Sequence, residues 1–155
     1  VIWAALARHA TPVGTTVWDW LRLSNGIPMI MASTQEEFVP QMINWEVLGG
    51  VSFQKGCYPG QEIVARTQYL GRLKRRMYLA HVAGSDAPAP GDNLYTPDME
   101  GQASGMVVNA APAPGGGFDL LAVAQIDSVA AGQPIHLKTP NGAVLQLKSL
   151  PYALP

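Results

Sequence analysis

The sequence predicts an α+β protein in which a mixed helical and extended region, residues 1–69, precedes a small six-stranded antiparallel β-barrel, residues 70–155. Two observations support this division. Apolar residues in the first part recur at helical spacing, and 18 of the 29 glycines and prolines fall between Gly84 and Pro155. Such frequent interruptions leave room for short strands joined by tight turns, which is typical of small barrels.

The first region is expected to begin with two helices and a short strand. Residues 2–7 and 17–23 have apolar side chains at helix-compatible spacing, and Asn25-Gly26 provides a turn or cap after the second helix. The run Ile-Pro-Met-Ile-Met at 27–31 predicts a strand, in which the proline indicates an edge or strand start.

A further helix is predicted from Thr34, which would be its N-cap, with acidic residues in the first turn. Phe38, Met42 and Trp45 then follow at helical spacing. Pro40 is compatible with this helix only close to its start. Gly49-Gly50 should end it.

The second region is expected to supply all six barrel strands. Their predicted ranges are 77–82, 93–95, 106–109, 118–125, 134–138 and 144–148. Asn141-Gly142, between the last two, is the strongest hairpin signal in the chain.

Composition excludes several classes of protein. One cysteine excludes internal disulfides, and a net charge of −1 argues against a surface that binds nucleic acid everywhere. No apolar run approaches the roughly 20 residues of a membrane span, and the opening stretch lacks the basic and apolar pattern of a signal peptide. We therefore expect a cytoplasmic protein. The start at Val1 suggests a processed chain or a piece of a longer one.

The segment Lys55-Gly56-Cys57-Tyr58-Pro59-Gly60-Gln61-Glu62 is the densest candidate site. Its two glycines bracket a tight loop, and the residues from Gln61 on have the composition of a helix start. A thiol next to a lysine and just ahead of a helix N-terminus is activated. These features favour a functional Cys57.

Other interpretations of Cys57 remain open from the residues alone. Free cysteines are often buried and inert. A Cys–His hydrolase would need a base, and His9, His81 and His136 are scattered along the chain. No ligand spacing typical of a metal site is present, so no metal is expected.

Five of the ten basic residues form a cluster between positions 66 and 76: Arg66, Arg72, Lys74, Arg75 and Arg76. No acidic residue occurs from 63 to 85. This asymmetry could attract phosphate, a polyglutamate tail or RNA, or it could be a solvated strand face. The four tryptophans all precede the motif. Most are expected in the core, with one or two lining a pocket for a flat heteroaromatic ligand.

The motif at 55–62, extended through Ile63-Val64-Ala65-Arg66, resembles the signature of the YgfZ family. These are folate-binding proteins related to the T-protein (aminomethyltransferase) of the glycine cleavage system. The similarity extends to residues 26–30, 38–41 with Asn44, and 48–53, and to the tail at 150–154. It thus covers effectively the whole chain.

The resemblance implies a longer protein, of which this chain is the C-terminal half. Residues 1–69 would be the last part of an α/β folate-binding region that carries the motif, and residues 70–155 the barrel. The implied role is to bind tetrahydrofolate and to assist assembly or repair of iron–sulfur enzymes, including one that modifies tRNA. Cys57 would carry the function with Lys55, while Tyr58, Gln61, Glu62, Arg66 and Arg22 would line or shape the folate site.

The resemblance also implies partners: folate, and iron–sulfur enzymes or their assembly proteins, with only weak or indirect contact to RNA. We expect a monomer. The alternative is an aminomethyltransferase-like enzyme. The T-protein has an acidic residue in an Arg-x-Glu-x-Gly-like run, where this chain has Ser24 within Arg22–Gly26, and it lacks the cysteine motif. The accessory role is therefore favoured.

Overall fold

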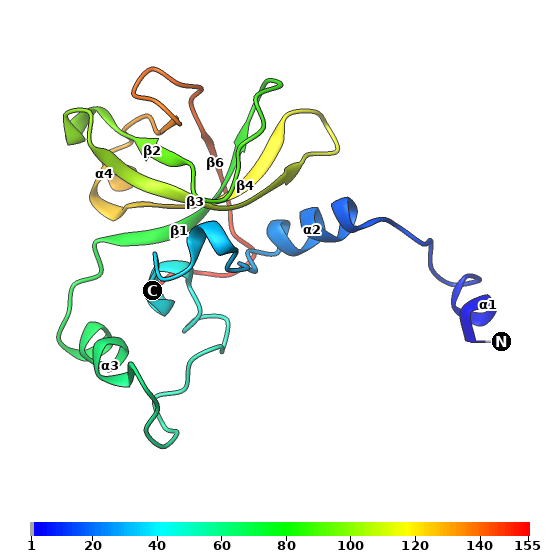
Figure 1. Cartoon of the computed structure of the whole chain (residues 1–155), viewed down its shortest axis with the longest axis horizontal. Helices are drawn as coiled ribbons and strands as arrows, with labels where there is room; N and C mark the ends of the chain where they lie inside the picture. Colours follow the sequence, from blue (N-terminus) through cyan, green and yellow to red (C-terminus); the bar gives the residue numbers. More distant parts are fainter. Residues whose placement is uncertain (1) are drawn as a thin grey trace.

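The computed structural model describes residues 2–155, and its centre is a six-stranded antiparallel sheet in the order β5-β2-β3-β4-β1-β6. Helical segments of the first region lie below one face of this sheet, as Figure 1 shows. The strands are β1 (Arg75–Val82), β2 (Asn93–Tyr95), β3 (Ala103–Pro112), β4 (Phe118–Gln125), β5 (His136–Leu137) and β6 (Gln146–Lys148). The helices are α1 (Ile2–Leu6), α2 (Thr15–Ser24), α3 (Gln61–Tyr69) and α4 (Ile126–Ala130), with short 3-10 turns η1 (Ala32–Thr34), η2 (Pro40–Ile43) and η3 (Pro97–Met99).

The predicted α+β class and all six strands are confirmed, but the closed barrel is wrong. The sheet curves into a half-barrel and stays open, because its edge strands β5 and β6 form no ladder with each other. The two edges approach through a single bridge between His136 and Val144. The hairpin predicted at Asn141-Gly142 is therefore confirmed only as this single bridge. Beyond it, β6 pairs with β1 and not with β5.

Strand β4 explains how both faces of the sheet are buried. Its residues alternate between two apolar clusters, because successive side chains of a strand point to opposite faces. Leu120 and Ala122 face the inside of the half-barrel with Leu94, while Leu121 and Val123 face the other side. A strand buried on both faces reads as a continuous apolar run, and 118–125 does so.

The first region supplies the cover for the outer face. Leu23 of α2 and Ile43 of η2 are buried against Met77 and Leu121. The predicted boundary near residue 70 therefore separates two segments that share one apolar cluster.

The strand predicted at 27–31 is wrong. This segment joins no ladder; instead, the Asn109 side chain pairs with the backbone at its centre. The amide of Asn109 donates to the Met29 carbonyl (2.9 Å) and accepts from the Met29 N–H (2.7 Å), which replaces a neighbouring strand.

The α-helix predicted from Thr34 through Trp45 is also wrong. Glu36 has a left-handed φ of 65°, which interrupts the helix, and a new 3-10 turn begins at Pro40 and ends at the left-handed Asn44. Phe38 and Met42 still pack against the outer cluster. The apolar spacing thus reports burial and not a continuous helix.

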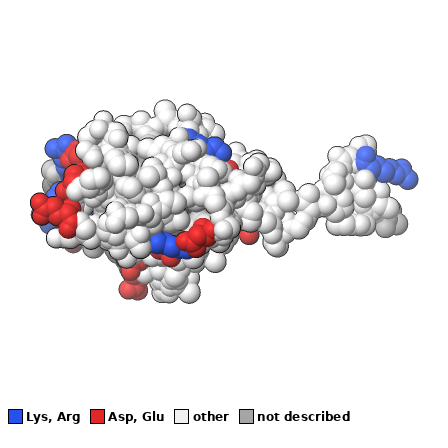
Figure 2. Space-filling model, turned by 90° about the horizontal axis from the view of Figure 1, so that it is seen from above, with Lys and Arg blue, Asp and Glu red and all other residues white. Residues whose placement is uncertain are grey.

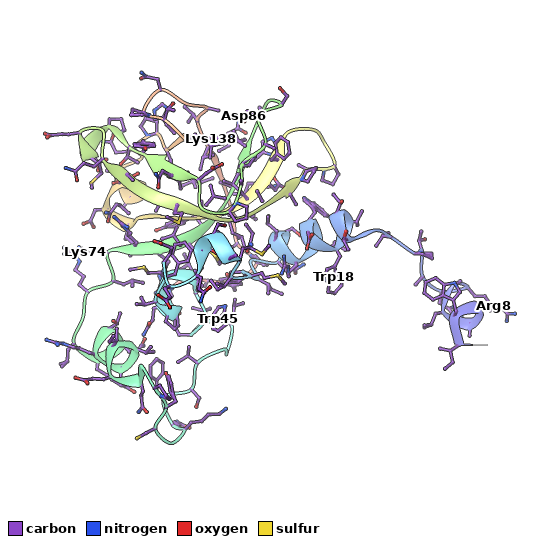
Figure 3. All side chains as sticks on the ribbon, in the orientation of Figure 1. Arg8, Trp18, Trp45, Lys74, Asp86 and Lys138 are labelled. Atoms are coloured by element: carbon purple, nitrogen blue, oxygen red, sulfur yellow. The ribbon has the colours of Figure 1, made fainter. Side chains whose placement is uncertain are left out.

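Three of the four tryptophans lie outside the core, contrary to the prediction. Trp3 and Trp18 are 70% and 63% exposed, and Trp45 is 37% exposed. Trp18 projects from α2 away from the sheet in Figure 3. Among residues 2–155, no helix is long and apolar enough to cross a membrane.

Candidate functional site

Cys57 lies on an exposed loop directly before α3, as the sequence predicts. Gly60 takes a left-handed φ of 82° at the junction, a conformation that favours glycine. The Gln61 side chain accepts from the Tyr58 N–H (3.0 Å), and the Gln61 N–H donates to the Tyr58 carbonyl (3.2 Å). Gln61 therefore braces the turn that presents the cysteine.

The thiol of Cys57 is free and exposed to solvent. The interpretation of a buried cysteine is therefore wrong for this chain, while the reactivity of the thiol stays a prediction. Because α3 begins four residues later, the helix N-terminus lies close to Cys57 in sequence. The side chain is available to a ligand or to a second macromolecule.

A pocket of about 400 Å³ adjoins the cysteine loop. Its walls combine the flanking motif residues Lys55 and Tyr58 with Trp45, which comes from the segment after η2. Pro40 and Val51 add apolar surface. The volume and the mixture of aromatic, apolar and a few polar groups are those of a small-molecule site. Trp45 thus lines this pocket, while Trp20 and Trp3 line other hollows; a flat heteroaromatic ligand stays a prediction.

The other predicted site residues lie elsewhere. Glu62 and Arg66 line a separate hollow of about 450 Å³ on α3, together with Tyr69. Arg22 lies on α2, which Figure 1 places well away from α3. Within this chain the structure therefore brings Lys55 and Tyr58 together, but not all the predicted residues.

Arg22 is mostly buried and only partly satisfied. Its Nη2 donates to Asp19 at 3.2 Å, while its Nε and Nη1 are buried without a hydrogen-bond partner. Buried charged donors are costly to leave unpaired. This guanidinium has unused capacity for a carboxylate or phosphate.

The predicted basic cluster does not form one surface. Arg76 pairs with Glu46 at 2.9 Å, and both side chains are about nine-tenths buried. Arg72 pairs with Asp127 at 3.4 Å on the surface. In Figure 2 acidic and basic side chains adjoin one another over a largely uncharged face. The solvated-face interpretation therefore fits Arg72, while Arg76 is a structural residue.

Sequence reasoning missed a polar cluster around Asp119. This carboxylate is 2% exposed and accepts from Trp20, His81 and Lys148. Burial acts to raise its pKa, but the hydrogen bonds from these three residues outweigh burial and hold the pKa of Asp119 below its ordinary value. The signal that the sequence offered for this cluster was Asp119 itself, the single acidic residue in the apolar run 118–125. Within residues 2–155, no three His, Cys, Asp or Glu side chains gather as metal ligands do.

Comparison with known proteins identifies the relatives of this chain, although no family model matches it. It is 35% identical over 138 residues to the tRNA-modifying protein YgfZ of Sodalis glossinidius (strain morsitans), which covers 88% of this chain and 42% of that protein. The protein of the same name from Yersinia enterocolitica serotype O:8 / biotype 1B is 36% identical over 150 residues, 96% of this chain and 45% of the relative. The protein of the same name from Edwardsiella ictaluri is 33% identical over 153 residues, which cover 98% of this chain and 46% of the relative.

The chain thus spans less than half the length of these curated relatives. The similarity nonetheless runs through the cysteine loop and the sheet, since it covers nearly all of residues 1–155. The chain therefore belongs to the YgfZ family.

Proposed function

We propose that this chain supplies the cysteine-loop part of a folate-binding accessory protein that supports iron–sulfur enzymes of tRNA modification. The observation that carries the proposal is the exposed Cys57 next to a pocket walled by Trp45, Lys55 and Tyr58. The relatives bear the name tRNA-modifying protein, which supplies the biological context.

The pocket residues fit a pterin ring. An aromatic wall of Trp45 and Tyr58 offers a stacking surface for a flat heterocycle, and about 400 Å³ is within the range of ligand sites. Arg22 lies outside this pocket, and its unpaired donors are buried, so the pterin site proposed here does not include it. Bound tetrahydrofolate would supply a reduced heterocycle able to carry a one-carbon unit.

The residues of the chain then have distinct roles. Cys57 offers a thiol at the surface, where an iron–sulfur client protein can reach it. Lys55 adds a positively charged side chain to the wall of the adjoining pocket. Gln61 fixes the turn through Tyr58, so that the loop presents the thiol in one conformation.

Ser24 argues against aminomethyl transfer as the main activity. It stands where the T-protein branch has an acid, and its hydroxyl donates to the Leu21 carbonyl at 2.9 Å. The side chain is thus engaged with its own helix.

The proposal is tested in a bacterial strain that lacks its YgfZ-type protein. The strain receives a chimera in which this chain replaces the matching 150 residues of the Y. enterocolitica relative. Modified tRNA nucleosides and iron–sulfur enzyme activities are measured. Cys57→Ser and Cys57→Ala should abolish the rescue that the parent chimera gives, at unchanged protein levels. Gln54→Ala, an exposed change in the same loop, should preserve it. Full rescue by both cysteine variants would overturn the role of Cys57.

Folate binding is tested separately by calorimetry with tetrahydrofolate. The chimera should bind, whereas residues 1–155 alone should bind at least about a hundredfold more weakly, because the proposal places part of the pocket outside this chain. Trp45→Ala in the chimera should weaken binding about tenfold, the size of one lost stacking contact. Val144→Ala, an exposed apolar position of the second region outside this pocket, is the control and should leave binding unchanged. Tight binding by the isolated chain would contradict the divided pocket.

A further inference from the structure

Another pocket, of about 500 Å³, lies between α2, the β3–β4 loop and the outer sheet face. Its walls include Trp20, His81, Lys148 and the loop segment 113–116. In Figure 1 the β3–β4 loop stands above α2, while the cysteine loop is at the opposite, lower end of the molecule. This pocket is therefore separate from the Cys57 site.

The strand register assembles the polar groups of this pocket. His81 of β1 lies directly opposite Asp119 of β4, and Lys148 of β6 lies opposite Leu79, two residues from His81. All three side chains therefore project from the outer face of the sheet, because residues two apart in a strand share a face. Trp20 closes the group from α2.

Asp119 organises the other side chains. It accepts from the indole N–H of Trp20 (2.9 Å) and from the Lys148 ammonium (3.1 and 3.2 Å), and its Oδ1 lies 2.9 Å from His81 Nδ1. An ionised carboxylate only accepts hydrogen bonds, so Nδ1 of His81 must carry the proton. The Asp119 side chain is 2% exposed, so its three partners separate the carboxylate from solvent.

The groups left for a ligand are the Lys148 ammonium, which donates, and Nε2 of His81, which donates only when the ring carries two protons. The Lys148 ammonium has three N–H bonds and is 45% exposed, so it retains capacity beyond Asp119. His81 is 25% exposed, and its Nε2 is free of the Asp119 bond. Gly117 lies against the edge of this ring, since a Cβ there would be 3.1 Å from Nε2. When His81 is protonated, the cluster carries a net charge of +1.

We propose that Lys148 and His81 bind a phosphate group in this pocket. A phosphate accepts from both the ammonium and the imidazolium, and its negative charge compensates the net positive charge of the cluster. The carrier is either free phosphate or a nucleoside monophosphate, whose base would pack on Trp20. The site does not depend on the proposed folate function.

The test follows the imidazole signals of His81 by NMR in mildly acidic buffer, during titration of residues 1–155 with inorganic phosphate, AMP or adenosine. Saturable shifts of His81 with phosphate and with AMP, but not with adenosine, are expected. The His9 and His136 signals should stay in place. At least about tenfold tighter binding of AMP than of phosphate assigns a nucleotide, and equal affinities assign free phosphate.

Two variants locate the binding site. Lys148→Gln retains a donor for Asp119 and should weaken phosphate binding about tenfold or more, the loss of one charge-assisted hydrogen bond. His81→Gln should weaken phosphate binding to a similar extent. Calorimetry measures the affinity of both variants. Lys138→Gln is the control, because that lysine pairs with Asp86 at 2.6 Å on another part of the surface, labelled in Figure 3. Absence of saturation, or unchanged affinity in both variants, would overturn the phosphate site.

Discussion

The two regions of the chain distribute their hydrophobic side chains very differently. Of the described residues, seventeen of the nineteen exposed large hydrophobic side chains lie between 2 and 70. Sixteen of the nineteen buried hydrophobic residues lie from Met77 onward. The second region thus surrounds cores on both faces of its sheet, whereas the first contributes only Leu23, Ile43 and Val64.

Exposed apolar surface on this scale marks an interaction site. The curated relatives are about twice as long as the stretch that matches this chain. We therefore expect the remainder of a YgfZ-family protein to cover the first region. The sheet, by contrast, should be stable without that cover, and substitutions can measure how the two regions depend on each other.

The largest effect is expected at the ion pair that joins the two regions. Arg76 of β1 contacts Glu46 at 2.9 Å and Asn44 at 3.1 Å. Arg76→Ala leaves the buried Glu46 carboxylate unpaired and should cost about 3–5 kcal/mol of unfolding free energy, measured with urea. Arg72→Ala removes a pair exposed at 85% on both sides and should cost less than about 1 kcal/mol. Equal losses of unfolding free energy in the two variants would contradict the distinction between a buried and an exposed ion pair.

The second effect concerns Asp119, whose donors come from both regions. Asp119→Asn should cost about 2 kcal/mol at neutral pH, the scale of hydrogen bonds to a charged group. Because the folded-state pKa of Asp119 is lowered, its contribution is present above the unfolded value of about 3.9 and is lost as the pH falls through the folded value.

Thermal unfolding from neutral pH to about pH 2 checks this sign. The parent should be more stable than Asp119→Asn at neutral pH, and this difference in stability should shrink progressively as the pH falls. A difference that stays constant, or that grows in acid, would show that the Asp119 charge contributes nothing.

An effect of similar size is expected at the turn after α2, where the C-terminal tail meets the first region. Gly26 has a φ of 67°, and a Cβ there would be 2.7 Å from the Tyr152 ring. Tyr152 also donates to the Gly26 carbonyl at 2.8 Å. Gly26→Ala should cost about 2 kcal/mol, from backbone strain and displacement of the ring.

Gly49→Ala separates these two causes. Its φ of 74° is equally left-handed, but a Cβ would meet nothing within 4 Å. The expected cost is therefore only about 1 kcal/mol of backbone strain. If both alanine variants lose the same stability, the tail does not pack against Gly26 in solution.

The same regional contrast explains what the sequence could predict. Strands 93–95 and 118–125 and the helix after Gly60 have local signals, and the structure confirms them. The segment 27–48 was predicted wrongly, because its conformation depends on partners far along the chain. Asn109 holds Met29 across 80 residues, and no local pattern contains that bond.

The candidate sites divide in the same way. The cysteine loop could be located because its glycines, proline and helix start are contiguous. The contribution of Trp45 to the adjoining pocket depends on an irregular turn that its spacing did not reveal. The cluster of His81, Asp119 and Lys148 requires the register of three strands, which only the fold supplies.

The smallest effect is expected at the exposed apolar surface itself, and it tests what covers the first region. Trp18 is 63% exposed on α2, so Trp18→Ala should change the unfolding free energy of residues 1–155 by less than about 0.5 kcal/mol. In the Y. enterocolitica chimera the same substitution should cost about 3 kcal/mol, because the added part would bury the indole. Small losses in both proteins would mean that this surface stays uncovered in the longer chain.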